Sequence, residues 1–202
     1  MNPILTIMIP TTVDRDGMFK TLMSEINRQL AVLYLLYGYD EKVEVISLRD
    51  NKEISVGAKR QKLLEMANGT WVVGIDSDDF IDPHYIQEIV GALKYNPDTD
   101  HVGFLEKCNI NGEESMSIFS IQHQSWDENK YGYDHIRCAN PKSVIRRSIA
   151  LQVGFKDERF GEDRIFSEAV TPLLKSEVFI DKPLYFYNHI SSDHNTRYGI
   201  TE

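Results

Sequence analysis

The sequence predicts an α/β domain in which helices cover both faces of a mostly parallel sheet. Two observations predict it. In the first hundred residues, short apolar runs alternate with helix-like apolar patterns in the order β-α-β-α-β-α. Polar loops follow the first three runs, at residues 11–17, 50–57 and 76–79, and the carboxyl ends of parallel strands are where such sheets bind ligands. A smaller mixed part is expected in the C-terminal half.

Local sequence signals predict where the helices and strands of the N-terminal half begin and end. Gly38 is a plausible stop for the first helix, and Pro83 stands in the first turn of the third. Right-handed crossovers between successive strands would make the sheet parallel. Buried strands are expected at residues 4–9 (ended by Pro10), 42–48 and 71–75, and helices at 18–37, 58–67 and 83–95.

The C-terminal half has less regular patterns. Asn111-Gly112 is a hairpin turn signal between two strand-like runs. Residues 124–140 are polar and aromatic without periodicity, which indicates a loop over the active site. Strands are expected at 101–106, 116–122, 177–180 and 184–188, and helices at 141–152 and from Glu162, the last burying Ile165, Phe166, Ala169 and Val170. With no repeat or linker, residues 1–202 are interpreted as a single domain.

Composition narrows the function class. The chain has 202 residues and a formal net charge of −9, which disfavours binding to nucleic acid mainly through its phosphates. Cys108 and Cys138 are too few for a disulfide framework or a Cys-rich zinc site, so a reduced, cytoplasmic location is expected. No secretory signal is apparent, and no apolar run approaches the ~18 residues that a membrane span needs.

Three carboxylates follow the strand expected at 71–75. Asp76 and Asp78 are two residues apart, with Ser77 between them, so both would point to one side of the backbone. Like charges this close favour a bound cation, and hard carboxylate oxygens suit Mn²⁺ or Mg²⁺. The alternative is an acidic capped turn, and Asp79 is interpreted chiefly in that way. The position at the ligand-binding edge favours a metal site.

Charged residues near two helix starts have alternative interpretations. Lys59 and Arg60 oppose the helix dipole, which an anion bound at the helix N-terminus would explain; solvated surface charges are the alternative. Glu162 and Asp163 are either stabilising first-turn acids or include a general base. His189 or His194 is either a surface residue or the ligand that completes a metal site. The basic residues Lys142, Arg146 and Arg147 are expected on a solvated helix face.

The run from Gly57 to Pro83 resembles family-two glycosyltransferases of the GT-A fold. The shared features are a Lys/Arg-bearing helix, Ala-x-Gly, an apolar strand, Asp-x-Asp-Asp and a helix headed by Pro. Further similarities, in the family's order and over nearly the whole chain, lie at 7–12, 161–163 and 184–189. The resemblance implies a Rossmann-like GT-A fold, with residues 1–100 binding the nucleotide sugar and 101–202 binding the acceptor and supporting catalysis. The compact size of the chain and its sequence pattern also resemble small glycosyltransferases of large bacteriophages. This resemblance would place the protein in the host cytoplasm.

The same resemblance assigns the donor site. By position, the residues expected to bind the donor are Pro10, Thr11, Thr12, Asp50, Lys59, Asp76 and Ser77. Asp50 would bind the base, and Lys59 would lie near the base or the diphosphate. The family's second strand often ends in Asp-Asp-Gly-Ser, whereas this chain has Leu48-Arg-Asp-Asn51, which leaves the role of Asp50 and the nucleotide preference open.

The metal and catalytic residues follow in the same way. Asp78 would hold Mn²⁺ or Mg²⁺ on the sugar diphosphate, Asp76 would contact the metal or the ribose, and His189 would be the distal ligand, with His194 as a substitute. Asp163 would be the base of an inverting transfer, and Glu162 would position the acceptor. The metal would offset charge on the departing diphosphate.

The sequence is thus interpreted as a metal-dependent glycosyltransferase that uses a nucleotide-diphospho sugar, with a UDP-sugar favoured. Candidate acceptors are a hydroxylated DNA base and a glycan, and no obligate protein partner is expected. Two alternatives remain open. A nucleotidyltransferase would usually have a Gly-rich loop after the first strand, and residues 10–16 lack one. A non-catalytic nucleotide-sugar-binding protein would not need a base at Asp163.

Overall fold

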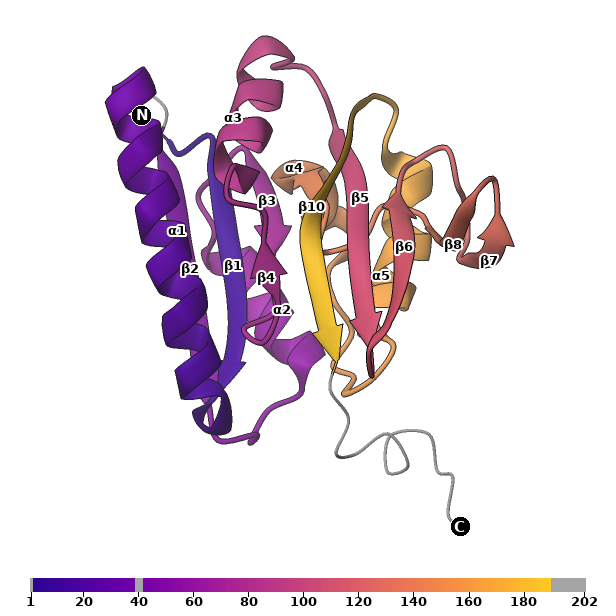
Figure 1. Cartoon of the computed structure of the whole chain (residues 1–202), viewed down its shortest axis with the longest axis horizontal. Helices are drawn as coiled ribbons and strands as arrows, with labels where there is room; N and C mark the ends of the chain where they lie inside the picture. The colour runs from indigo at the N-terminus through magenta and orange to yellow at the C-terminus, as the bar shows by residue number, and fades with distance from the viewer. Residues whose placement is uncertain (1, 39–41, 190–202) are drawn as a thin grey trace.

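The computed structural model describes residues 2–38 and 42–189, with side chains described as far as Tyr187 except that of Tyr37. One sheet runs through the molecule in the order β2-β1-β3-β9-β5-β6-β8-β7, and β10 pairs with β4 and β5 (Figure 1). The strands are β1 Leu5–Thr12, β2 Val43–Asp50, β3 Trp71–Gly74, β4 Phe80–Ile81, β5 His101–Ile110, β6 Glu113–Phe119, β7 Asp127–Lys130, β8 Tyr133–Arg137, β9 Val144–Arg146 and β10 Glu177–His189.

Helices cover both faces of this sheet. The α-helices are α1 Asp16–Tyr37, α2 Val56–Met66, α3 Tyr85–Tyr95, α4 Arg147–Val153 and α5 Glu162–Val170, and the 3₁₀ helices are η1 Val13–Arg15 and η2 Thr171–Leu173. Successive side chains of β1 point to opposite faces. Leu5, Ile7 and Ile9 pack in one core with α1 and α3, whereas Met8 packs in a second core with α2, α4 and α5. Both faces are buried, as expected for a parallel sheet.

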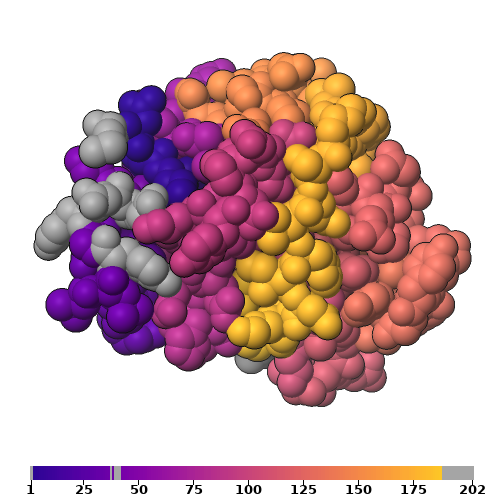
Figure 2. Space-filling model, turned by 90° about the horizontal axis from the view of Figure 1, so that it is seen from above, coloured from indigo at the N-terminus to yellow at the C-terminus, as the bar shows by residue number. Residues whose placement is uncertain are grey.

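The parallel part of the sheet aligns the ends of its strands. β1 is parallel to β2 and β3, and β10 is parallel to β5. The arrowheads of β1, β5 and β10 consequently point to one edge in Figure 1, where the loops after β1, β2 and β3 emerge. Viewed from above, β10 forms a yellow band between the magenta elements of the N-terminal half and the pink elements that follow (Figure 2). The predicted mixed α/β fold with a mostly parallel sheet is confirmed.

Several predicted boundaries in the N-terminal half need correction. The first strand continues through Pro10 to Thr12. Because β3 pairs with β1 only as far as Met8, Pro10 lies where β1 has one paired neighbour, and its missing N–H is tolerated there. The short strand β4 was not predicted, and α3 begins at Tyr85, two residues after Pro83.

The C-terminal half departs further from its predictions. The loop expected at 124–140 contains the hairpin β7–β8, and the helix expected at 141–152 is a turn, the strand β9 and then α4. The strands expected at 177–180 and 184–188 are one strand, β10, with a register shift near Pro183. In α5, Phe166 and Val170 are buried as predicted, whereas Ile165 and Ala169 are exposed. The Asn111-Gly112 hairpin is confirmed, with both residues at positive φ.

Candidate active site

The ligand-binding edge carries a cleft of about 740 Å³ between the two halves of the chain. On the N-terminal side it is lined by the end of β1, the start of α2 and the turn after β3. On the C-terminal side it is lined by one face of β5, β6, β7 and β8 and by the start of α5. Eight of the eleven predicted site residues line this cleft: Pro10, Thr11, Thr12, Lys59, Asp76, Asp78, Glu162 and Asp163.

Arg60 joins the two sides of the cleft. It is 5% exposed, and its Nη2 donates to Oδ1 of Asp76 at 2.6 Å while its Nε donates to Oε1 of Glu162 at 3.2 Å. Burial alone would lower the pKa of the guanidinium, but the charges of Asp76 and Glu162 outweigh burial and raise it. Arg60 is therefore a permanent cation between one carboxylate of each half.

Backbone contacts hold the start of α2 close to the loop that precedes α5. Gly57, at the start of α2, donates its N–H to the carbonyl of Glu158 at 3.1 Å, and a Cβ there would lie 1.9 Å from the carbonyl oxygen of Lys156. Gly161 then adopts a left-handed conformation, φ 76°, immediately before α5. The two glycines bring the first turn of α2 against the loop that leads to Glu162.

Lys59 has a different set of partners. Its Nζ forms an ion pair with Asp50 and donates to the carbonyl of Thr11 at 2.9 Å. Lys59 and Arg60 are both buried, so the alternative of solvated surface charges is wrong. Asp50 does not line the cleft, and its contact with Lys59 and with the N–H of Ile54 explains why its pKa is lowered although burial alone would raise it.

The turn that follows β3 presents its carboxylates in different environments. Asp76 and Asp78 line the cleft and Ser77 is fully buried. Burial would raise the pKa of Asp76, but Arg60, with smaller effects from Lys142 and Arg15, holds it below its ordinary value. Asp78 forms an ion pair of 2.9 Å with Arg15. Both carboxylates therefore line the cleft, and each is paired with an arginine.

Asp79 closes the turn from behind. Its N–H donates to the carbonyl of Asp76, and its Oδ2 accepts a hydrogen bond of 2.7 Å from the hydroxyl of Tyr185. That hydroxyl in turn accepts from the N–H of Asp76 at 3.0 Å. Burial, and then repulsion from Asp76, raise the pKa of Asp79 to about 7 although the cation Lys142 opposes them. Asp79 thus holds the turn in shape, which agrees with its predicted role.

Lys142 reaches the same turn from the other side. Its Nζ lies 3.0 Å from Oε1 of Glu106 and 3.4 Å from Oδ2 of Asp79, against the rings of Tyr185 and Tyr187. The prediction of a solvated basic helix face is wrong here, because Lys142 precedes β9 and its side chain is 14% exposed. Arg146 is also engaged, with Asp100 at 3.2 Å and over the ring of Trp71.

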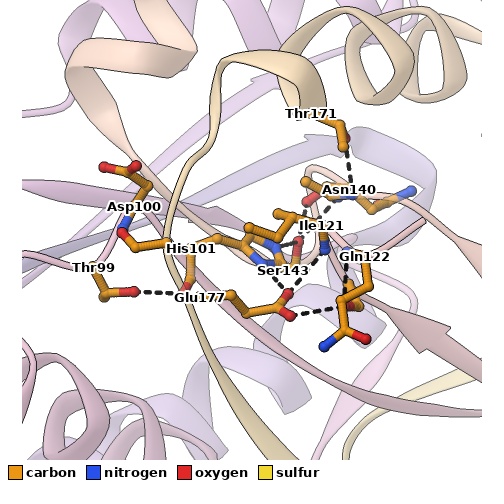
Figure 3. Close-up of polar contacts among 12 residues, drawn as sticks. Thr99, Asp100, His101, Ile121, Gln122, Asn140, Ser143, Thr171 and Glu177 are labelled. Carbon is orange, nitrogen blue, oxygen red and sulfur yellow. Dashed lines mark hydrogen bonds and ion pairs between the residues drawn. The ribbon is translucent and has the colours of Figure 1, made fainter. Parts of the chain in front are cut away.

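A buried network holds the loop that carries Lys142 (Figure 3). His101 contacts Oε1 of Glu177 at 2.8 Å through Nδ1 and Oγ of Ser143 at 2.7 Å through Nε2. Ser143 donates to the carbonyl of Asn140, whose side-chain oxygen accepts from the N–H of Lys142. Burial would raise the pKa of Glu177, but hydrogen bonds from His101, Ser120 and the N–H of Ile121 keep it low. The network is enclosed, which makes it structural.

The two acids at the start of α5 also differ. Glu162 is 5% exposed and bonded to Arg60; burial raises its pKa against the attraction of that cation. Asp163 lines the cleft and is only partly buried, and its Oδ1 accepts the N–H of Arg164 at 2.8 Å. Asp163 is thus the acid that a bound molecule can reach.

The carboxylates of the turn after β3 suit a hard cation. Asp76 and Asp78 offer carboxylate oxygens to one cleft, which is the chemistry that Mn²⁺ and Mg²⁺ prefer. Within the described part of the chain, no group of three or more His, Cys, Asp or Glu side chains forms a complete metal cage. The two carboxylates would consequently need ligands from a substrate or from His189. The backbone of His189 pairs with Ile110 at the end of β10, its side chain lies outside the described residues, and so does all of His194.

Three comparisons place the chain among known proteins. A family model described as glycosyl transferase family 2 matches residues 24–154. The chain belongs to this family. The putative glycosyltransferase EpsH of Bacillus subtilis (strain 168) is 27% identical over 149 residues, which are 68% of this chain and 43% of EpsH.

Several solved structures share the fold. S. aureus TarS 1–349 in complex with UDP-GlcNAc superposes with a TM-score of 0.63 at 15% identity, over 95% of this chain and 60% of that one. The mannosyltransferase PcManGT of Pyrobaculum calidifontis, in complex with GDP-Man and Mn²⁺, gives 0.56 at 10% identity, over 98% and 60%. At these identities the likeness concerns the GT-A fold alone. The chain spans about half of its relatives' own lengths, and none of these comparisons supports a bacteriophage origin.

Three residues of the site have roles that the sequence does not indicate. The sequence marks Arg60 only as a cation that opposes its helix dipole, whereas its bridging role depends on Glu162, 102 residues away. It marks Lys142 only as part of a basic cluster. Tyr185 gives no signal, since a tyrosine in an apolar strand is ordinary core composition.

Among the described helices, none is long and apolar enough to cross a membrane.

Proposed function

We propose that this protein is a metal-dependent glycosyltransferase that moves a sugar from a nucleotide-diphospho donor to an acceptor hydroxyl with inversion. The observation that carries the proposal is the single cleft onto which Asp76, Asp78 and Asp163 all open. Family membership and the fold agree with it. A UDP-sugar is the first donor to test, because the TarS structures contain UDP-GlcNAc or UDP.

The donor is expected on the N-terminal side of the cleft. Pro10, Thr11 and Thr12 line it there, so a nucleotide would contact the chain at this end of β1. Lys59, held against Asp50 beside Thr11, would set the shape of the base-binding end. Residues 1–100 would thus bind the donor and 101–202 the acceptor.

A divalent cation would be held by Asp78 and Asp76, with His189 as the proposed distal ligand, and it would offset the charge that develops on the leaving diphosphate. Arg15 and Arg60 contact the same two carboxylates and keep them oriented toward the cleft. Arg60 also links Asp76 to Glu162, so that the donor turn and the start of α5 keep a fixed separation. Such fixed geometry is what places two substrates for reaction.

Asp163 is proposed as the general base. Its carboxylate would accept the proton of the acceptor hydroxyl while that oxygen bonds to the anomeric carbon and the bond from that carbon to the diphosphate breaks. Attack opposite the leaving group inverts the anomeric configuration. Glu162 is less suited to this role, because it is buried and held by Arg60. Glu162 would instead orient Arg60 and the first turn of α5 for the acceptor.

A thermal-shift screen of UDP-, GDP- and TDP-sugars with and without Mn²⁺ tests the proposal. A ligand at 100 times its Kd stabilises by about 2.7 kcal/mol, which corresponds to roughly 5–10 °C in a protein of this size. We expect such a shift with one nucleotide and Mn²⁺ together, and none in Asp78→Ala. If no nucleoside diphosphate changes the melting temperature under either condition, the proposed function is wrong.

A further inference from the structure

One face of the C-terminal strands forms a wall of the cleft, and one end of this wall adjoins the turn after β3 through Lys142. Glu106 of β5, Ser117 of β6, His135 of β8 and Glu128 of β7 are successive register partners, and all four line the cleft. Partners in register lie on the same face of a sheet, about 5 Å apart from one strand to the next. They therefore make a continuous polar row of hydrogen-bonding side chains across four strands.

The charges of this row are mutually paired. Glu106 binds Lys142, Oε1 of Glu128 binds Nη1 of Arg137 at 2.9 Å, and Oε2 of Glu128 contacts Nδ1 of His135. Each cation of the row thus has a carboxylate partner in the same wall. A phosphate or carboxylate placed there would have to compete with those partners, because no excess positive charge favours it.

Hydroxyl groups suit the row better than anions. Ser117 adds a hydroxyl beside the sulfur of Cys108, and His135 adds a ring whose Nε2 lies 3.1 Å from Oγ of Ser115, so the wall combines donors with acceptors. Rings flank the row on both sides, with Trp126 beneath Arg137 and Tyr187 beside Lys142. Mixed donors, acceptors and aromatic faces match a sugar, which combines hydroxyl edges with apolar C–H faces.

Two of the three residues of the basic cluster, Lys142 and Arg146, are engaged with carboxylates of the chain. Lys142 is held between Glu106 and Asp79, and Arg146 is held by Asp100, so neither offers its charge to a phosphate backbone. With a net charge of −9 for the whole chain, long-range attraction to DNA is also lacking. Of the acceptors considered from the sequence, the structure favours the glycan over the DNA base.

We propose that the row Glu106-Ser117-His135-Glu128 is the acceptor subsite and that it binds an uncharged sugar through its hydroxyls. The inference rests on the proposed function, since it names the acceptor of that same transfer. The row lines the same cleft as Asp76, Asp78 and Asp163, and its Glu106 end adjoins the turn after β3 through Lys142. A hydroxyl of the bound sugar would thereby be presented to the base.

The test uses the full chain with Mn²⁺ and the nucleotide sugar that the thermal screen selects. The acceptor probes are methyl glycosides of neutral hexoses and of N-acetylglucosamine, a methyl glucuronide, and a DNA duplex containing 5-hydroxymethylcytosine. Calorimetry measures donor binding, and release of the nucleoside diphosphate measures transfer. The variant is His135→Ala, and the matched control is His84→Ala, whose side chain is 69% exposed outside the cleft.

We expect transfer to a neutral glycoside, with its KM raised about tenfold or more in His135→Ala, as the loss of one or more hydrogen bonds predicts. The donor Kd should be unchanged in that variant, and His84→Ala should behave as the parent protein. Transfer only to the glucuronide or the duplex, no transfer to a neutral glycoside, or an unaltered acceptor KM in His135→Ala would overturn the acceptor assignment while donor binding stands. Absence of donor binding in the parent protein would overturn the proposed function as well.

Discussion

Arg60 and Asp76 form a partly buried ion pair, with Nη2 of the guanidinium 2.6 Å from Oδ1 of the carboxylate. The same guanidinium reaches Glu162 at 3.2 Å, so one side chain connects the turn after β3 with the start of α5. Arg60 thereby links the proposed donor-binding residues to the proposed catalytic residues through ion pairs. Loss of these ion pairs should lower both the stability of the fold and the affinity for the donor.

Arg60→Met should destabilise the protein by about 3–5 kcal/mol, because it leaves the buried Glu162 and the partly buried Asp76 without their cation. Arg60→Lys should recover only part of this loss, since an ammonium cannot reproduce the two-sided contact of a guanidinium. Urea unfolding measures both. Lys107→Met, which removes an exposed pair with Glu114, is the control and should cost less than about 1 kcal/mol. Equal losses for Arg60→Met and the control would contradict the bridging role.

Asp163→Asn should lower kcat by about 10²–10⁴-fold if this carboxylate accepts the acceptor proton. Donor binding should persist, because Asp163 lies on the acceptor side of the cleft. Single-turnover transfer and donor calorimetry on the same preparation separate the two effects. Glu162→Gln is the matched comparison and should weaken the Arg60 contact and lower the melting temperature as well. Transfer at the parent rate by Asp163→Asn would exclude it as the base.

Asp79 should make the metal-free protein less stable as pH rises. Its pKa is raised from 3.8 to about 7, so the folded state holds a proton that the unfolded state has lost. This contribution is fully present below pH 3.8 and disappears as pH rises through 7. Asp79→Asn keeps an acceptor for Tyr185 and removes the titration, so it should gain up to about 4 kcal/mol relative to the parent between pH 4 and 7. Urea unfolding in a metal chelator measures this, and parallel pH profiles would show that Asp79 titrates normally.

Glu177 should show the opposite dependence. Its pKa is held below 4.5 by His101, Ser120 and Ile121 against the effect of burial, so its stabilisation is present above that pH and is lost as pH falls below it. Glu177→Gln should therefore be less stable than the parent at neutral pH, with the difference shrinking on acidification. Thermal unfolding between pH 3 and 7 measures the trend. A difference that stays constant over this range would contradict the assigned pKa direction.

The parts of the fold that the sequence predicted are those with strong local signals. The buried run 71–75 and the amphipathic stripe of α1 have periodicities that few alternatives share. The hairpin β7–β8 was missed because its residues are polar and half exposed, with no apolar alternation to mark a strand. Residues 141–152 have helical spacing, yet Val144 and Ile145 are drawn into the sheet between β3 and β5. Tertiary pairing outweighed local propensity there.

The sequence also predicts some residues of the candidate site and not others. Asp76, Asp78 and Asp163 could be selected because acids at strand ends and helix starts are visible in sequence. The partners that set their behaviour could not, because Arg60, Lys142 and Tyr185 acquire their roles only from contacts between distant segments. Tyr185 meets Asp79 across 106 residues. Charges that look solvated in a sequence are in this case the buried counter-ions of the site.

Calorimetric titration of the screened nucleoside diphosphate, with Mn²⁺ present, into the parent protein and into Asp78→Ala tests the central claim most directly. Asp163→Asn serves as the control, since its carboxylate is assigned to the base and not to the metal. We predict saturable binding by the parent and by Asp163→Asn that requires Mn²⁺, and no measurable binding by folded Asp78→Ala. Undiminished Mn²⁺-dependent binding by Asp78→Ala would contradict the account of this cleft as a metal-dependent donor site.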